Sequence, residues 1–166
     1  MSWSSLITSD RFSNQYVSSR AVTILHKTYF NTFRHMCPPQ YLVKGLQFRE
    51  QGGHGLIELY MDCGYGSPVV FTNNGRGDPN RKKTCNDLDH YGFRAVQGRE
   101  QSRRGIINTN MLCTGSSDWT TSNGNMNGEW NAVQYCPDKW VITGFEVREQ
   151  SGYGIINFRY RCTEMS

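Results

Sequence analysis

The sequence predicts an all-β domain in which three antiparallel sheets surround a pseudo-threefold axis as a β-prism, with a β-trefoil as the alternative. Three observations favour this class. A unit of about 50 residues occurs three times. Apolar residues alternate along each unit, as in half-buried strands. The composition, with 17 glycines and only 19% charged residues, suits short strands and tight turns better than helices.

The length and hydropathy limit the remaining possibilities. A chain of 166 residues is the size of one domain. Its apolar content of 37% is high enough to exclude a disordered chain. No apolar run approaches the roughly 20 residues of a membrane-spanning helix. We therefore expect a single globular domain without a membrane span.

The repeat is defined by matched cysteines, glycines and one polar triplet. Segment 37–63 reads CPPQYLVKGLQFREQGGHGLIELYMDC and aligns without a gap to 136–162, CPDKWVITGFEVREQSGYGIINFRYRC. Segment 85–113, CNDLDHYGFRAVQGREQSRRGIINTNMLC, has two extra residues near its start. The Arg-Glu-Gln triplets begin at Arg49, Arg99 and Arg148, which are 50 and 49 residues apart. We divide the domain into repeats of about 1–66, 67–115 and 116–166.

Each repeat is predicted to contain one antiparallel hairpin. Leu46 and Phe48 alternate in the first half of a unit, as do Phe145 and Val147. The glycine-rich links at 52–55, 102–105 and 151–154 supply the turns. The second halves alternate apolar residues at Ile57, Leu59, Met61 and Cys63; at Ile107, Met111 and Cys113; and at Ile156, Phe158, Tyr160 and Cys162.

The stretches between hairpins are expected to form further short hairpins. Segments 64–84 and 114–135 are rich in Gly, Asn, Ser and Thr, and their strand candidates are Val69–Thr72 and Glu129–Gln134. Residues 1–36 would supply the matching piece for the first unit. Three such units, each with one apolar face, bury those faces by closing on one another, which also protects the sheet edges.

Six cysteines at equivalent repeat positions predict three disulfides and an oxidising compartment. There is no Cys-x-x-Cys spacing, and no metal site or cofactor is predicted. Residues 1–10 lack the basic and apolar regions of a secretory signal, so either a signal has been removed or the thiols are reduced inside the cell. We expect secretion. The repeat pairs the cysteines as Cys37–Cys63, Cys85–Cys113 and Cys136–Cys162.

The positive charge is concentrated in one stretch. Residues 76–104 carry a net charge of +4, which equals that of the whole chain. Such a segment can attract sulfated or otherwise acidic polysaccharide. No nucleic-acid-binding module accompanies it, so nucleic acid is not predicted as a partner.

The third repeat resembles the vitelline membrane outer layer protein family. The resemblance is carried by Cys136-Pro137, Thr143-Gly144-Phe145, Glu149-Gln150, Gly152-Tyr153-Gly154, Asn157 and Arg161-Cys162, with Trp130 upstream. It implies a β-prism of three sheets, with a charged groove at one prism end and Glu at the matching position as the ligand site. The family's longer Asp-Asp-Thr-Ala-type turn is missing, and Glu58 replaces the Asn in the first repeat. The chain is also similar to dermatopontin in cysteine spacing. Both resemblances imply an extracellular coat or matrix protein with affinity for glycans.

The Arg-Glu-Gln triplets are the main candidate ligand site. Their side chains would present hydrogen-bond donors and acceptors to sugar hydroxyls around one mouth of the prism. The alternative is structural: each Arg would bond a neighbouring Glu or a turn carbonyl and clasp the fold together. His54 and Tyr153 occupy matching turn positions and join the candidates. The triplet candidates are Arg49, Glu50, Gln51, Arg99, Glu100, Gln101, Arg148, Glu149 and Gln150.

Two further readings of the sequence are weaker. Arg76-Gly77-Asp78, within a loop rich in Gly and Asn, matches an integrin-type adhesion tripeptide, although a simple turn explains it as well. Catalysis is not predicted, because glutamates beside arginines would have lowered pKa values and would not act as general acids.

These observations predict a secreted, non-catalytic carbohydrate-binding protein of an extracellular coat, mucous layer or matrix. Its partners would be glycans, including acidic or sulfated ones, and coat or matrix glycoproteins. The first alternative is a structural coat protein that assembles through protein contacts without specific sugar binding. The second is a glycan-processing enzyme.

Overall fold

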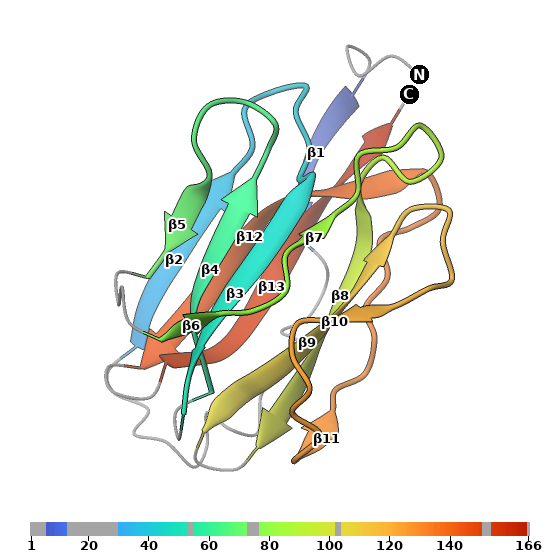
Figure 1. The fold of residues 1–166 in the computed structure, drawn as a ribbon. Coiled ribbons are helices and arrows are strands. Elements are labelled where there is room, and N and C mark those ends of the chain that lie inside the picture. The colour runs from blue at the N-terminus through green and yellow to red at the C-terminus, as the bar shows by residue number, and fades with distance from the viewer. Residues whose placement is uncertain are drawn as a thin grey trace.

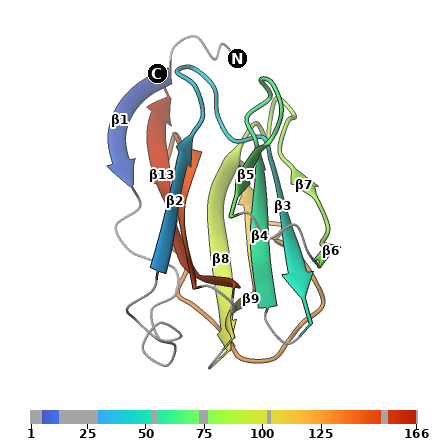
Figure 2. The same ribbon diagram turned by 90° about the vertical axis from the view of Figure 1, so that its left-hand side faces the viewer.

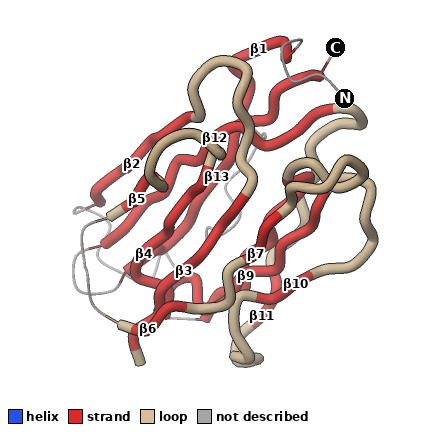
Figure 3. Tube along the Cα trace, turned by 45° about the horizontal axis from the view of Figure 1, so that its top comes forward, coloured by secondary structure: helices blue, strands red, loops and turns tan. Residues whose placement is uncertain are grey.

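A computed structural model describes residues 6–12, 30–52, 55–72, 77–101, 104–150 and 154–165. Over these residues the chain forms strands joined by loops, with no helix (Figure 3). Accordingly, none of the described segments is a helix that is long and apolar enough to cross a membrane.

The strands form three separate antiparallel sheets, each built on one repeat hairpin (Figure 1). In the first sheet the strand order is β5-β4-β3, and two short strands, β6 and β7, both pair with the outer edge of β3. The bounds are β3 (Gly45–Gln51), β4 (Gly55–Asp62), β5 (Val69–Phe71), β6 (Asp78–Pro79) and β7 (Lys83–Thr84). In the second, the order is β10-β9-β8-β11: β8 (Phe93–Gln101), β9 (Gly105–Cys113), β10 (Thr120–Thr121) and β11 (Glu129–Trp130). In the third, the order is β1-β13-β12-β2: β1 (Leu6–Phe12), β2 (Phe30–Met36), β12 (Trp140–Gln150) and β13 (Gly154–Met165).

The three hairpins share one apolar core, which lies between the sheets (Figure 2). The rings of Phe71, Phe158 and Tyr160 surround Phe145, with centroid distances to that ring of 6.5, 6.2 and 5.7 Å. Most of the alternating positions predicted from the sequence point into this core. The prediction was wrong for Ile57, Ile107 and Ile156, which are buried outside the core, because a register shift in each hairpin puts Leu56, Ile106 and Ile155 there instead. The core's members from the hairpin strands include Leu46, Phe48, Leu59, Met61, Val96, Met111, Phe145, Val147, Phe158 and Tyr160.

A ring of backbone hydrogen bonds connects the units at the end that carries the disulfides, here called the cystine end. The amide of Cys37 donates to the carbonyl of Thr143 at 2.8 Å. The amide of Cys85 donates to Lys44 at 2.8 Å, and that of Cys136 donates to Arg94 at 2.9 Å. Each unit therefore bonds to the preceding one at the same position, and the third unit precedes the first.

A second ring closes the opposite end, here called the turn end, through glycine. Gly55, Gly105 and Gly154 have φ values of +75°, +77° and +86°. A Cβ atom on Gly55 would lie 2.7 Å from the carbonyl oxygen of Ile106. On Gly105 it would lie 2.4 Å from that of Ile155, and on Gly154 it would lie 2.5 Å from that of Leu56. This cyclic arrangement confirms the predicted pseudo-threefold prism and requires glycine at each position.

The predicted disulfides are confirmed. Cys37–Cys63, Cys85–Cys113 and Cys136–Cys162 join the open ends of the three hairpins, with Cα–Cα distances of 5.7, 5.6 and 5.7 Å. All six cysteines are buried. Each disulfide thus lies at the edge of the core, directly below the hydrogen-bonded ring of the cystine end.

The segments between hairpins differ from the prediction. They do not pair with themselves but cover both edges of the preceding hairpin, because each hairpin has two free edges. In the first sheet β5 covers β4, and the chain then returns along β3 as β6 and β7. The candidate Val69–Thr72 ends at Phe71, since Thr72 turns at a φ of +65°. The candidate Glu129–Gln134 is a strand only over Glu129–Trp130.

The N-terminal segment pairs with the third hairpin, whereas we expected it beside the first. One reason lies at three equivalent positions. Gln47 and Gln97 donate to the backbone carbonyls of Asn80 and Asn131, at 3.0 and 2.6 Å, in the returning segments. The third repeat has Glu146 instead, which is buried and needs cations. Arg34 on β2 donates twice to it, at 3.0 and 2.7 Å, and Arg159 donates from β13.

Candidate functional site

The Arg-Glu-Gln triplets occupy equivalent places at the turn end. In each hairpin the register shifts between Arg and Glu, so that the second strand holds an extra residue, namely Ile57, Ile107 or Ile156. A β-bulge of this kind changes the direction of the side chains beside it. The three triplets therefore lie around one end of the prism, as the repeat predicts.

Arg49 and Arg99 both donate hydrogen bonds to loops of the protein itself. Arg99 Nε donates to the carbonyl of Asn127 at 2.6 Å, and Nη2 donates to those of Gly128 at 2.9 Å and of Met126. Its guanidinium also lies 5.2 Å from the centroid of the Trp130 ring. Arg49 Nη1 donates to the carbonyl of Gly77 at 3.1 Å. These contacts fit the structural alternative, in which an arginine clasps a turn.

Two of the three glutamates of the triplets are buried. Glu100 and Glu149 are both 8% exposed, and Glu50 is half-buried. The register places Asp78 opposite Glu50 and Glu129 opposite Glu100. The third unit differs, because Asn31 lies opposite Glu149 and donates to its Oε1 at 3.4 Å. Two carboxylate pairs and one carboxylate–amide pair thus lie at the turn end.

The expectation of lowered glutamate pKa values was wrong for Glu50. Burial raises its pKa above the ordinary value of 4.5, and the negative charge of Asp78 raises it further. The guanidinium of the neighbouring Arg49 is directed at Gly77 and the ring of Tyr60. Proximity in sequence therefore did not bring the two charges together.

The raised pKa of Glu50 predicts a dependence of stability on pH. A carboxyl group with a higher pKa in the folded state stabilises that state at pH values below the pKa of the unfolded chain. That contribution is lost as pH rises from about 4.5 through the folded-state pKa of Glu50. Urea unfolding from pH 4 to 7 should therefore show Glu50→Gln gaining stability relative to the native chain. If the difference in unfolding free energy between Glu50→Gln and the native chain stayed constant from pH 4 to 7, the raised pKa would be wrong. The control is Glu164→Gln, which removes an exposed carboxylate near the end of β13.

A polar position opposite each arginine was visible in the repeat but was not selected as a site. The residue opposite each arginine in its hairpin is polar and buried. It is Glu58 opposite Arg49, Asn108 opposite Arg99 and Asn157 opposite Arg148. Asn108 organises a loop: Nδ2 donates to the carbonyls of Asn123 and Asn125, and Oδ1 accepts from Ser122 Oγ at 2.8 Å. A hydrogen bond with Glu58 raises the pKa of Tyr60. The matched positions in the aligned repeats were the signal that could have identified this set.

The remaining triplet residues lie at the tips of the same hairpins. Gln51 and Gln101 are half-buried, and Gln150 is 3% exposed. They pair with Gly55, Gly105 and Gly154, the glycines of the turn-end ring. His54 and Tyr153 fall outside the described residues.

The Arg-Gly-Asp tripeptide is partly built into the sheet. Arg76 falls outside the described residues. Gly77, at a φ of +84°, would place a Cβ atom 2.2 Å from the carbonyl oxygen of Glu50. Asp78 is exposed and begins β6 opposite Glu50. These contacts give Gly77 and Asp78 a structural role, and cell adhesion stays a prediction.

The basic residues of 76–104 are divided between two sheets. Lys82 Nζ lies 4.0 Å from Asp62 Oδ2 in the first sheet. Arg94, on β8 of the second sheet, lies 4.9 Å from the centroid of the Tyr135 ring. Across the described chain, no group of three or more His, Cys, Asp or Glu side chains could hold a metal ion.

Comparisons with known proteins agree with this architecture. A family model described as vitelline membrane outer layer protein I (VOMI) matches residues 70–166. No curated protein matches the sequence.

Solved structures of similar fold are found among lectins. A prostate-specific WGA16 glycoprotein lectin superposes with a TM-score of 0.68 at 10% identity, covering 86% of this chain and 96% of that one. Single chain recombinant jacalin gives 0.57 at 14% identity over 81% and 87%. Calystegia sepium agglutinin gives 0.56 at 16% identity over 83% and 89%. These likenesses show the fold.

Proposed function

We infer the function of this protein from the family to which it belongs, the vitelline membrane outer layer protein I family. We propose a secreted, non-catalytic carbohydrate-binding protein of an extracellular coat, mucous layer or matrix. Three disulfides, each joining buried cysteines, support secretion, because such bonds persist in oxidising compartments.

The observation that carries the proposal is the threefold set of glutamates at the turn end. Glu50, Glu100 and Glu149 lie at one end of a prism whose fold is shared with proteins named as lectins. Carboxylates accept strong hydrogen bonds from sugar hydroxyls, and enclosed ones keep a fixed geometry. Arg49 and Arg99 support the site by fixing the loops that adjoin Glu50 and Glu100.

We assign the ligands to glycans, including acidic or sulfated ones attracted by the excess of basic residues in 76–104. Coat and matrix glycoproteins would carry such glycans. Binding to a sulfated glycan should weaken as salt is raised, because salt screens exposed charges.

The test is a glycan array probed with the native chain and with Glu50→Gln/Glu100→Gln/Glu149→Gln. Each lost charge-assisted hydrogen bond costs about 1.5–3 kcal/mol, so binding should weaken by more than tenfold. The control is Asp87→Asn/Asp89→Asn/Asp118→Asn, which removes three exposed carboxylates from the loops that follow Cys85 and Cys113, away from the turn end. Circular dichroism verifies folding, and Glu50→Gln alone serves if the triple variant does not fold. Equal binding by all variants would contradict this site.

The structural alternative also has an observation in its favour. Arg49 and Arg99 donate hydrogen bonds to turn carbonyls, as residues that clasp the fold together would. Under this alternative the protein assembles through its own surfaces and no glycan binds. A glycan array that gives no signal at high protein concentration would support this structural alternative. If oligosaccharides incubated with the protein were shortened, that result would instead support a glycan-processing enzyme.

A further inference from the structure

Two exposed tyrosines form a ring pair at the cystine end of the first unit. Tyr41 lies in the loop before β3, and Tyr65 lies in the loop after β4. Their ring centroids are 5.0 Å apart with the planes tilted by 45°. The residues are 37% and 63% exposed. Two large rings held together in solvent form a continuous apolar surface with hydroxyl groups at its rim.

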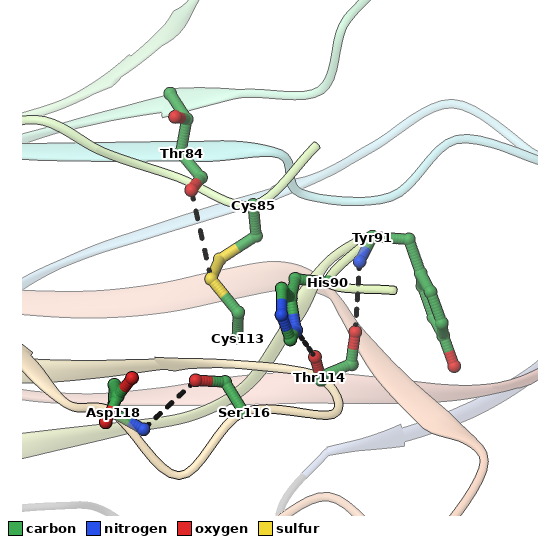
Figure 4. Close-up of a disulfide and its surroundings, with 8 residues drawn as sticks. All are labelled: Thr84, Cys85, His90, Tyr91, Cys113, Thr114, Ser116 and Asp118. Atoms are coloured by element: carbon green, nitrogen blue, oxygen red, sulfur yellow. Dashed lines mark hydrogen bonds between the residues drawn. A yellow bond between two sulfur atoms is a disulfide. The ribbon is translucent and has the colours of Figure 1, made fainter. Parts of the chain in front are cut away.

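The equivalent corner of the second unit is closed by hydrogen bonds. Figure 4 shows His90 and Tyr91, which follow Cys85, both bonded to Thr114, which follows Cys113. His90 Nδ1 lies 2.9 Å from the Thr114 carbonyl oxygen, and the Tyr91 amide donates to Thr114 Oγ1 at 3.1 Å. Hydrogen bonds thus join the two loops of the second unit at the position where the first unit has the contact between the two rings.

The third corner is closed by strand pairing. Trp140 corresponds to Tyr41, lies opposite Glu164 in the hairpin and packs against the core. The amide of Met165 also donates to the carbonyl of Lys139 at 3.0 Å. Among the three corners at this end, the first therefore departs from the pattern by exposing its aromatic residues.

Charged side chains lie beside Gly64, the residue that precedes Tyr65. Gly64, next to Tyr65, has a φ of +73°, and a Cβ atom there would lie 3.0 Å from Lys44 Cδ and 3.5 Å from Lys44 Nζ. The ammonium group of Lys44 thus lies beside the backbone that carries Tyr65. Asp62 Oδ1 accepts from the Gly64 amide at 2.8 Å, and Asp62 Oδ2 lies 4.0 Å from Lys82 Nζ. Together these two lysines and one aspartate leave a net positive charge near Gly64, next to Tyr65 in the chain.

We propose that Tyr41, Tyr65 and Lys44 form a second saccharide-binding site, which takes a negatively charged sugar. The apolar face of a pyranose ring packs on the tyrosine rings, and the ammonium group of Lys44 binds a carboxylate or sulfate on the sugar. Asp62 accepts a hydrogen bond from a sugar hydroxyl and, through its bond from the Gly64 amide, fixes the backbone there. The site lies at the end of the prism opposite the glutamates. It rests on the proposed function only in taking glycans as the ligand class.

The test follows the backbone amide of Gly64 by NMR during titration with three tetrasaccharides. Chondroitin sulfate supplies sulfate and carboxylate, hyaluronan supplies carboxylate alone, and maltotetraose is neutral. The two acidic probes should shift the Gly64 signal and maltotetraose should not, while the ratio of the two affinities separates sulfate from carboxylate. Tyr65→Ala should weaken binding about five- to tenfold, and Tyr65→Phe should retain it because the ring remains. Lys44→Gln should weaken binding and reduce its salt dependence.

The outcomes separate this site from the turn end. If Tyr65→Ala and Lys44→Gln bind the acidic probes as the native chain does, the second site is wrong. If these variants bind normally while the glutamate variant loses binding, only the turn-end proposal stands. If no tetrasaccharide or array glycan binds, both proposals fail. Concentration-dependent shifts of Gly64 without any sugar would assign the tyrosine pair to contacts between copies of the chain, which also overturns the site.

Discussion

Replacing Gly105 by alanine is expected to lower the free energy of unfolding by about 3 kcal/mol or more. Two costs add at this position. A non-glycine residue in the left-handed region costs about 1–2 kcal/mol, and the φ of Gly105 is +77°. The new Cβ atom would also lie 2.4 Å from the carbonyl oxygen of Ile155, and overpacking of this kind costs about 1–3 kcal/mol. The backbone of Gly105 and that of Ile155 cannot separate without a further loss of stability, because both belong to the turn-end ring.

Two matched variants separate these costs. Gly66 has a φ of +69° with nothing within 4 Å of its Cβ position, so Gly66→Ala should show the backbone cost alone. Gly52 also has nothing within 4 Å and lies at a negative-φ position, so Gly52→Ala should be close to neutral. Urea unfolding measures all three. A Gly105→Ala loss no greater than that of Gly66→Ala would show that the closely packed threefold ring is not as described.

Reduction of the three disulfides should unfold the protein. Each closes a loop with a sequence separation of 26 or 28 residues, which contributes about 3.5 kcal/mol in the chain-entropy model. Three such terms total about 10 kcal/mol, comparable to the 5–15 kcal/mol stability of an ordinary domain. Far-ultraviolet circular dichroism in mild urea, with and without dithiothreitol, would measure the loss of β-structure on reduction.

The paired variant Cys136→Ala/Cys162→Ala isolates one bridge. It should lower the free energy of unfolding by about 3.5 kcal/mol while leaving a cooperative transition. Its control is the native chain in oxidising buffer, with the pairing verified by peptide mapping without reductant. A fully reduced chain that unfolds at the same urea concentration as the oxidised one would contradict the assigned role of the disulfides.

The hairpins, the disulfides and the prism were predictable because the repeat encodes them three times. Alternation at Leu46, Phe48, Leu59 and Met61 specifies which face is buried, and the matched cysteines specify the pairing. The outer strands were not predictable in the same way. β6 and β7 have only two residues each, which is too short for any period to appear. The pairing of β2 with β12 depends on Arg34 meeting Glu146, a contact across 112 residues that no local pattern reveals.

The candidate site was predictable in position but not in the use of its side chains. The sequence brought the triplets together, since bulge and turn recur in every unit. It did not show that Arg49 and Arg99 would bond loop carbonyls, because those carbonyls follow 28 or so residues later in irregular segments. It also suggested the wrong direction for the pKa of Glu50, which depends on Asp78 across the sheet edge.

The pairing of β1 and β2 with the last hairpin orders events during synthesis. The first and second sheets draw their strands from separate stretches of the chain, Gly45–Thr84 and Phe93–Trp130, and each can assemble as the chain emerges into the compartment where it folds. The third sheet joins β1 and β2, which end at Met36, to β12 and β13, which begin at Trp140. Strands β1 and β2 therefore find their partners only after Met165 has emerged, and until then their edges are open to pairing with other chains.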